Sequence, residues 1–245
     1  MTASRASRSG HVRAVYEMAA SRYDRYYRRA WLFAAGGAAE AAMLDHVGQV
    51  ASVMDRPKAL DAGAGTGAFS RRLQAFVPVL HPVLVDLSPA MLGQASDLND
   101  PRAIATLGAL PFGDDSFDII VCAWVIETVD DPRAVVAELL RVLRPGGLLT
   151  YSFCSRPARL RDRWRTGPIR AVVHAFFSGH FLSEEQSPFH ACAMSRRRAF
   201  SGGAVTVVSL GKCCTVAPAV PATRTVGATR PVSDTAAGRR AAMHP

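Results

Sequence analysis

The chain has 245 residues, of which 49% are hydrophobic, and this favours one domain with a single large core and some appendages. The longest unbroken apolar run covers residues 119–126, far short of the roughly 20 residues that a membrane-spanning helix needs. No apolar stretch follows the N-terminal arginines as it would in a signal peptide. We therefore expect a cytoplasmic protein without a membrane span.

The net charge of +9 is carried by basic flanks around an acidic middle. Basic flanks can hold nucleic acid, but only Lys58 and Lys212 among the 29 basic residues are lysines, which is more typical of a biased base composition. No nucleic-acid partner is therefore expected. The five cysteines form no CxxC pair and no zinc-like spacing with histidine, so neither a disulfide framework nor a metal site is expected.

The first predicted element is helical. Residues 11–43 read as one or two helices that are rich in aromatic residues. Their tyrosines would either cover the core at a solvent edge or close over a ligand. On the second interpretation, residues 1–45 form an N-terminal helical lid.

Residues 58–154 alternate short apolar runs with helical patterns, which is typical of βαβ units and a parallel sheet. Two of the predicted helices begin with a capping residue followed by proline, at Ser88-Pro89 and at Asp131-Pro132. The second of these repeats apolar residues at helical spacing until Arg144-Pro145-Gly146-Gly147 ends it. The predicted strands cover residues 58–62, 82–87, 103–107, 117–125 and 148–154.

Beyond residue 155 the pattern weakens into a basic segment, residues 156–170, and an apolar one, residues 171–177. Ser183-Glu184-Glu185-Gln186 looks like a capping box that opens a helix, which Ser187-Pro188 then interrupts or restarts. A terminal hairpin is predicted from residues 204–210 and 213–216, joined at Gly211-Lys212. The composition beyond Pro218 predicts a disordered tail.

The most informative segment is ALDAGAGTGAFS, residues 59–70, where a strand runs into glycines and then into a helix. Glycines let the backbone turn tightly and approach a ligand, and the helix N-terminus presents free N–H groups. Gly63, Gly65 and Ala68 also satisfy the dinucleotide-binding pattern, with Asp86 about where a ribose-binding acid would lie. The segment alone therefore leaves open which nucleotide-like ligand is bound.

Further motifs accompany the glycines: Asp61 before them, Asp86 ending the second strand, the run ALPFGDDSFD over residues 109–118, and residues 144–147. This ordered set resembles the class I S-adenosylmethionine-dependent methyltransferases, in particular the type 11 group, which includes the ubiquinone and menaquinone C-methyltransferases. The resemblance covers residues 11–154 well and the rest loosely. It implies S-adenosyl-L-methionine as cofactor and a small molecule as methyl acceptor.

The resemblance also implies an α/β fold with a Rossmann-like, mostly parallel sheet of seven strands, the last two forming the antiparallel hairpin. The methyltransferase domain would span residues 46–217, with residues 156–190 inserted as part of the lid. Residues 218–245 would form the tail.

On matching positions the resemblance implies a cofactor site. Gly63, Gly65 and Gly67 would wrap the methionine part of the cofactor, with Asp61 supporting its ammonium group. Asp86 would accept hydrogen bonds from both ribose hydroxyls, although either aspartate could instead only cap its strand-to-helix turn. The other expected site residues are Leu87, Thr106 and Leu107 around the adenine, and Ala123 and Trp124 near the sulfonium.

Methyl transfer needs chiefly a well-placed acceptor and the exclusion of water, so a general base is optional. For a phenol or alcohol acceptor the leading candidate base is Glu127, which follows the fourth strand where related proteins often have histidine. The alternative is that Glu127 is a solvated loop acid. The other candidate bases are His174, His180, His190, Tyr16 and Tyr23.

Other kinds of function stay open. An RNA or protein methyltransferase could use the basic flanks, although the chain has no Asn-Pro-Pro-Tyr type tetrapeptide and no recognisable RNA-binding motif. A cofactor-binding protein without catalysis, or an NAD-dependent enzyme, could share the same strand, turn and helix. The sequence decides neither the acceptor, nor the atom methylated, nor the oligomeric state.

Overall fold

The structure is a computed structural model that describes residues 8–176, 180–188 and 195–212. The chain begins with α1 (Arg8–Tyr26), a π-helical segment η1 (Tyr27–Gly36) and α2 (Gly37–Ala51). Strands and helices then alternate except between β3 and β4: β1 (Ala59–Ala62), α3 (Ala68–Phe76), β2 (Val83–Asp86), α4 (Pro89–Gly93), β3 (Arg102–Ile104), β4 (Phe117–Ala123), α5 (Pro132–Val142) and β5 (Leu143–Cys154). The last described elements are α6 (Leu160–Arg165), α7 (Gly167–Phe176), β6 (Ser195–Phe200), a 3-10 turn η2 (Ser201–Gly203) and β7 (Val205–Gly211).

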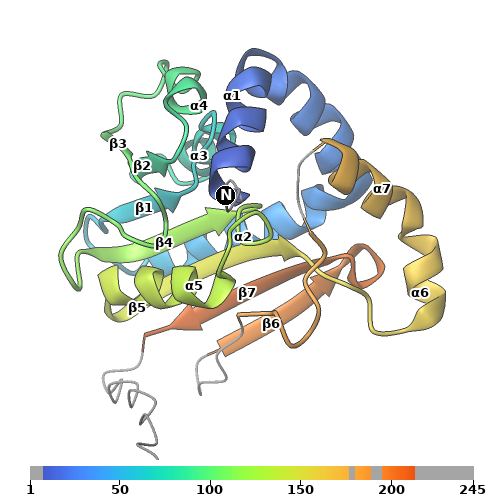
Figure 1. The fold of residues 1–245 in the computed structure, drawn as a ribbon. Helices are drawn as coiled ribbons and strands as arrows, with labels where there is room; N and C mark the ends of the chain where they lie inside the picture. Colours follow the sequence, from blue (N-terminus) through green and yellow to red (C-terminus); the bar gives the residue numbers. More distant parts are fainter. Residues whose placement is uncertain (1–7, 177–179, 189–194, 213–245) are drawn as a thin grey trace, which may run out of the picture. The chain divides into compact units, whose positions relative to one another are not determined.

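Seven strands form one sheet in the order β3-β2-β1-β4-β5-β7-β6 (Figure 1). The pairs among β1 to β5 are parallel, whereas β7 runs antiparallel to both β5 and β6. The order reverses between β1 and β4, and ligands of such open sheets bind in the crevice outside the carboxyl ends of the strands at this reversal. The predicted mostly parallel sheet with an antiparallel terminal pair is confirmed.

Helices cover both faces of the sheet, which explains why its central strands read as continuous apolar runs. On one face Met43 and Val47 of α2 and Leu73 of α3 pack against the strands. On the other face Val136 and Leu139 of α5 do so. The apolar periodicity of the predicted helix after Asp131 therefore belongs to the core.

Both predicted helix starts are formed as the sequence indicates. Ser88 Oγ accepts a hydrogen bond from the Met91 N–H at 3.3 Å, and Asp131 accepts from the N–H groups of Arg133 and Ala134. Each cap satisfies backbone donors that a helix N-terminus leaves free.

The predicted pairing of the terminal hairpin is wrong. β7 pairs with β5 along one edge and, along the other, with β6, which precedes it and is joined to it by η2. Residues 213–216 lie outside the described residues. β6 has the sequence SRRRAF and lies at the sheet edge with its middle residues exposed. An exposed, charged edge strand has no apolar alternation, so the pattern of its sequence does not predict a strand.

The predicted helix after Ser183 does not form within residues 180–188. The hydrogen bonds of the capping box are nevertheless present, because Ser183 Oγ accepts from the Gln186 N–H and Gln186 Oε1 accepts from the Ser183 N–H. The box closes a single turn, and Pro188 cannot donate the next backbone hydrogen bond of a helix.

Two further expectations concern element limits. The third strand was expected over residues 103–107 but β3 covers only Arg102–Ile104, so Thr106 and Leu107 lie in the loop that follows it. The predicted disordered tail, residues 218–245, falls outside the described residues. Within the described part of the chain, no helix combines the length and apolar character needed to cross a membrane.

Candidate functional site

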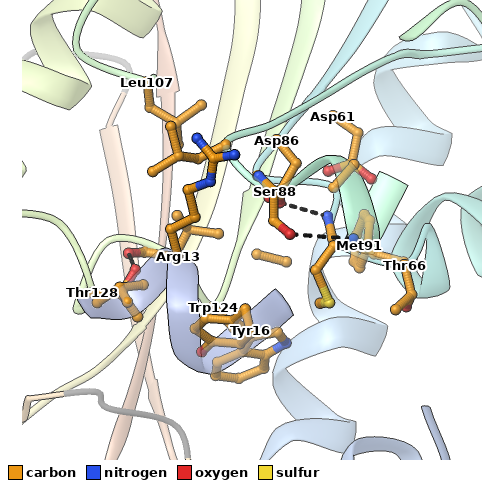
Figure 2. Close-up of a pocket in the computed structure, with 18 of the residues that line it drawn as sticks. Arg13, Tyr16, Asp61, Thr66, Asp86, Ser88, Met91, Leu107, Trp124 and Thr128 are labelled. Atoms are coloured by element: carbon orange, nitrogen blue, oxygen red, sulfur yellow. Dashed lines mark hydrogen bonds between the residues drawn. The ribbon is translucent and has the colours of Figure 1, made fainter. Parts of the chain in front are cut away.

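A pocket opens at the carboxyl ends of β1, β2 and β4, where the strand order reverses. Its walls come from the glycine turn after β1, the start of α4, the loop after β3, the end of β4 and the helix α1. Figure 2 shows these side chains around one cavity. Nine predicted site residues line it: Asp61, Gly63, Gly65, Asp86, Leu87, Thr106, Leu107, Ala123 and Trp124.

The three glycines of the turn all have positive φ, at +79°, +56° and +78° for Gly63, Gly65 and Gly67. A Cβ at Gly63 would lie 2.4 Å from Val125, and one at Gly67 would lie 2.9 Å from Ala95. Those two glycines are therefore required by packing, and Gly67 is not among the residues that line the pocket. A Cβ at Gly65 would meet only the flexible end of Met91, at 3.3 Å, so Gly65 leaves the space above the turn open.

Asp86 ends β2 and holds the glycine turn in place. Its Oδ2 accepts from the Gly65 N–H at 2.8 Å, and its Oδ1 accepts from the Ser88 N–H at 2.9 Å. Burial raises the pKa of Asp86, and these two backbone donors oppose the rise. Asp86 therefore caps its strand-to-helix turn, as one interpretation of the sequence expected. Each carboxylate oxygen also keeps a further lone pair, and because the residue lines the pocket it could accept hydrogen bonds from a ligand.

Asp61 lies beneath the turn at the end of β1 and is almost fully buried. Its Oδ2 accepts from the Ser70 hydroxyl at 2.5 Å. Burial raises the pKa of the Asp61 carboxyl to about 7, although the Ser70 hydrogen bond lowers it. A cationic group in the pocket would reverse this rise, because a nearby positive charge favours the carboxylate.

The loop after β3 forms the opposite wall. Thr106 and Leu107 line the pocket together with Leu87, which follows β2. The Thr106 hydroxyl oxygen accepts only a long hydrogen bond, 3.4 Å, from the Gly108 N–H. It therefore keeps most of its capacity to accept a second donor.

Trp124 at the end of β4 adopts a left-handed backbone, with φ at +62°, which is unusual for a bulky residue. Its indole Nε1 donates to buried Glu40 at 2.9 Å, and its ring meets Trp31 edge-on with centroids 5.1 Å apart. Arg72 in turn pairs with Glu40. These contacts fix a strained residue against the pocket, as is common where a backbone positions a ligand.

Glu127 lies in the turn that follows Trp124 after β4. Its side chain is buried, at 4% exposed, so the alternative that Glu127 is a solvated loop acid is wrong. It does not line the pocket, but Trp124, Val125 and Thr128 around it do. Burial raises the pKa of its carboxyl to about 7, and the Cys154 thiol hydrogen-bonds it. Its Oε2 has no hydrogen-bond partner among the described residues.

The helix α1 supplies Val12, Arg13, Tyr16 and Tyr23 to the pocket. The centroids of the two tyrosine rings lie 5.6 Å apart. Burial raises the pKa of the Tyr16 phenol, and the nearby charge of Glu127 adds to the rise. Burial raises the pKa of Tyr23 as well. Aromatic enrichment of residues 11–43 was the one signal in the sequence for this wall, and no pattern pointed to Arg13.

A polar contact ties α1 to the glycine turn. The buried Thr66 hydroxyl donates to Asp24 Oδ1 at 2.5 Å, and Arg71 donates to the Thr66 carbonyl oxygen at 2.9 Å. Arg71 also pairs with Asp97 beyond α4. The position of Thr66 inside the glycine motif could have marked it as a site residue, whereas its partner Asp24 lies 42 residues away in sequence.

The other candidate bases are placed differently. His180 is exposed, and its backbone N–H donates to the Glu127 carbonyl oxygen at 3.3 Å. His190 and the side chain of His174 lie outside what the structure describes. Among the described candidates, Tyr16 and Tyr23 line the pocket and Glu127 lies behind it.

Comparison with known proteins agrees with this geometry. The family described as a methyltransferase domain matches residues 60–151. The demethylmenaquinone methyltransferase of Clavibacter sepedonicus is 34% identical over 184 residues, 71% of this chain and 70% of that protein. The malonyl-[acyl-carrier protein] O-methyltransferase of Hahella chejuensis is 37% identical over 131 residues, 51% of this chain and 47% of that protein.

The matched part of the chain therefore spans about half the length of the Hahella protein and 70% of the length of the Clavibacter protein. A crystal structure of an S-adenosylmethionine-dependent methyltransferase from Thermotoga maritima superposes with a TM-score of 0.54 at 19% identity. That superposition covers 81% of this chain and 98% of that one, and it supports the fold.

Proposed function

Because the chain belongs to the class I S-adenosylmethionine-dependent methyltransferases, we propose that it transfers the methyl group of S-adenosylmethionine to a small-molecule acceptor. The observation that carries the proposal is the pocket itself. One buried acid, one open glycine turn and one acid at the next strand end face a common cavity at the sheet reversal.

The residues fit the cofactor of this family. The open space above Gly65 would take the methionine part, and buried Asp61 would meet its ammonium group, which lowers the raised pKa of that carboxyl. Asp86 would use its remaining lone pairs for the ribose hydroxyls. Leu87, Thr106 and Leu107 would surround the adenine, and Ala123 and Trp124 would face the sulfur.

When bound, S-adenosylmethionine supplies a methyl group that is activated by its positively charged sulfur. The protein has to hold the acceptor in line and keep water out. Tyr16 and Tyr23 of α1 line the cavity, and α1 would act as a lid over the bound acceptor. The two relatives are named for different acceptors, so the acceptor of this chain is proposed only as a small molecule.

For an acceptor that carries a proton, Glu127 is the proposed proton acceptor. It is a buried carboxyl whose raised pKa lies in the range suited to a general base, and its charge acts on the Tyr16 phenol, which reaches the cavity. Glu127 Oε2, which has no hydrogen-bond partner among the described residues, would take the proton, and the Tyr16 phenol in the cavity would orient the acceptor. Tyr16→Phe should then lower turnover while leaving the affinity for the cofactor unchanged.

The test is equilibrium dialysis of the full chain against S-adenosylmethionine and, separately, NAD. We expect S-adenosylmethionine to bind and NAD not to bind, and the reverse would assign the chain to the nicotinamide enzymes. Transfer of a labelled methyl group to small molecules of a cell extract then separates an enzyme from a protein that only binds the cofactor. Activity on bulk RNA that falls steeply with salt would instead favour a nucleic-acid substrate.

A further inference from the structure

Helix α6 carries two large apolar side chains on its outer side. Leu160 is 70% exposed and Trp164 is 85% exposed. They lie four residues apart and therefore on the same side of the helix. A surface helix usually turns such a pair toward the core, but no residue of α6 is buried.

The helix is nevertheless a fixed element. Arg163 Nε donates to the Pro157 carbonyl oxygen at 2.8 Å, and the buried Thr166 hydroxyl donates to the Asp162 carbonyl oxygen at 2.8 Å. α6 also packs on the turn η2, which joins the edge strand β6 to β7 (Figure 1). The exposed apolar pair is thus displayed at a defined place on the fold.

The surroundings of this pair are strongly basic. Arg159, Arg161 and Arg165 are exposed, and Asp162 is the one acid of the helix, 3.6 Å from Arg161. Arg161 and Arg165 are like charges four residues apart, which destabilises a helix unless an anion neutralises them. Beyond η2, the edge strand β6 adds three exposed arginines, residues 196–198.

We propose that α6 docks the protein on an anionic lipid surface, with Trp164 and Leu160 inserted among the headgroups and the flanking arginines on lipid phosphates. Tryptophan and leucine beside arginine is the combination that interfacial helices use. Nucleic acid would bind the arginines through its phosphates, but it offers no apolar phase into which the Leu160 side chain could insert. A tryptophan that is 85% exposed stands out from the surface, and a soft lipid phase accepts it without a shaped groove.

The experiment is co-sedimentation of the full chain with vesicles of phosphatidylglycerol and phosphatidylcholine in equal parts, compared with vesicles of phosphatidylcholine alone. We expect binding to the anionic vesicles, weakened by salt, and little binding to the neutral ones. The double variant Leu160→Ser/Trp164→Ser should bind anionic vesicles at least about tenfold more weakly, since binding scales with inserted apolar area. The matched control is Phe33→Ser, which removes a 94% exposed aromatic residue of η1 and should leave binding unchanged.

Tryptophan fluorescence gives a second readout. Of the three tryptophans, Trp31 and Trp124 are buried, so a blue shift on vesicle binding has to come from Trp164 and should vanish in Trp164→Phe. No binding to anionic vesicles, equal binding to both kinds of vesicle, or an equal loss in Phe33→Ser would overturn the proposal. The proposal also fails if the double variant keeps the vesicle affinity of the parent. If that variant instead loses only an affinity for bulk RNA, α6 would be assigned to nucleic-acid binding. Because binding is measured without an acceptor, the result does not depend on the proposed methyl transfer.

Discussion

Gly65 is the position in the glycine turn where a side chain would occupy pocket space and disturb little else. Gly65→Val should abolish binding of S-adenosylmethionine and leave the chain folded, although the branched residue at positive φ costs about 1–2 kcal/mol of stability. Calorimetric affinity and thermal melting check both parts. Gly93→Val, at an exposed glycine with open space around it, is the control and should bind normally. Normal affinity in folded Gly65→Val would remove the basis for the site.

Asp86 has two tasks that a mutation can separate. Asp86→Ala should weaken cofactor binding by about 1.5 to 3 kcal/mol, the usual worth of hydrogen bonds to a charged group, and also loosen the turn that Gly65 and Ser88 anchor. Asp131→Ala removes the N-cap of α5 at a residue that does not line the pocket, and should cost about 1 kcal/mol of stability with no change in affinity. If the two variants behave alike, Asp86 only caps its turn.

Thr106 stands where an acid would hold the adenine amino group more strongly. Thr106→Asp should tighten binding of S-adenosylhomocysteine, because bonds to charged groups are worth about 1.5 to 3 kcal/mol against about 1 for neutral ones. The residue is exposed, so the introduced aspartate would keep its charge. Titration calorimetry of both proteins measures the difference. Equal or weaker binding by the folded variant would place the amino group elsewhere.

At the scale of an element, Asp24 ties α1 to the glycine turn through the Thr66 hydroxyl and an ion pair with Arg71. Asp24→Ala removes the acceptor of the Thr66 hydroxyl and leaves a buried donor without it, so we expect α1 to open about fivefold more often. Hydrogen exchange of the α1 amides should show this, with weaker cofactor binding. Met18→Ala removes an exposed side chain of the same helix that does not line the pocket, and it should change neither. Unchanged exchange in Asp24→Ala would mean that packing alone seats α1.

For the whole molecule, two buried acids with a raised pKa make the stability depend on pH. Burial raises the pKa of Glu127 and of Asp61 to about 7, whereas carboxyls of an unfolded chain titrate near about 4. Between these values the folded protein holds protons that the unfolded chain has lost. The free energy of unfolding should therefore fall as the pH rises from about 4 to about 7, and level off above that.

Glu127→Gln should remove part of this decline. Above pH 7 the free energy of unfolding of the variant should exceed that of the parent by up to about 3 kcal/mol, as denaturant titration would measure. Glu138→Gln is the control of opposite sign. The Arg141 guanidinium lowers the pKa of Glu138, so its stabilising contribution is present above about pH 4 and should be lost in the variant. A flat profile for the parent between pH 4 and 7 would contradict the buried state of Glu127.

The sequence by itself determined the parts of this protein whose cause is local. The apolar strands β1, β2 and β4, the caps at Ser88 and Asp131, and the glycine turn between two acids each depend on neighbours a few residues away, and each lies close to its predicted place. A parallel sheet then brings the carboxyl ends of β1, β2 and β4 to one edge, so most of the predicted site residues line one pocket.

Only the tertiary structure decided the parts whose partners are far apart in the chain. The pairing of β7 with β6, the clasp between Asp24 and Thr66, and the burial of Glu127 all depend on elements that no periodicity connects. The strained backbone of Trp124 persists because Glu40 and Trp31 hold its ring. Exposed strands and long-range polar contacts leave no pattern in the sequence, since folding in three dimensions creates the burial that makes them stable.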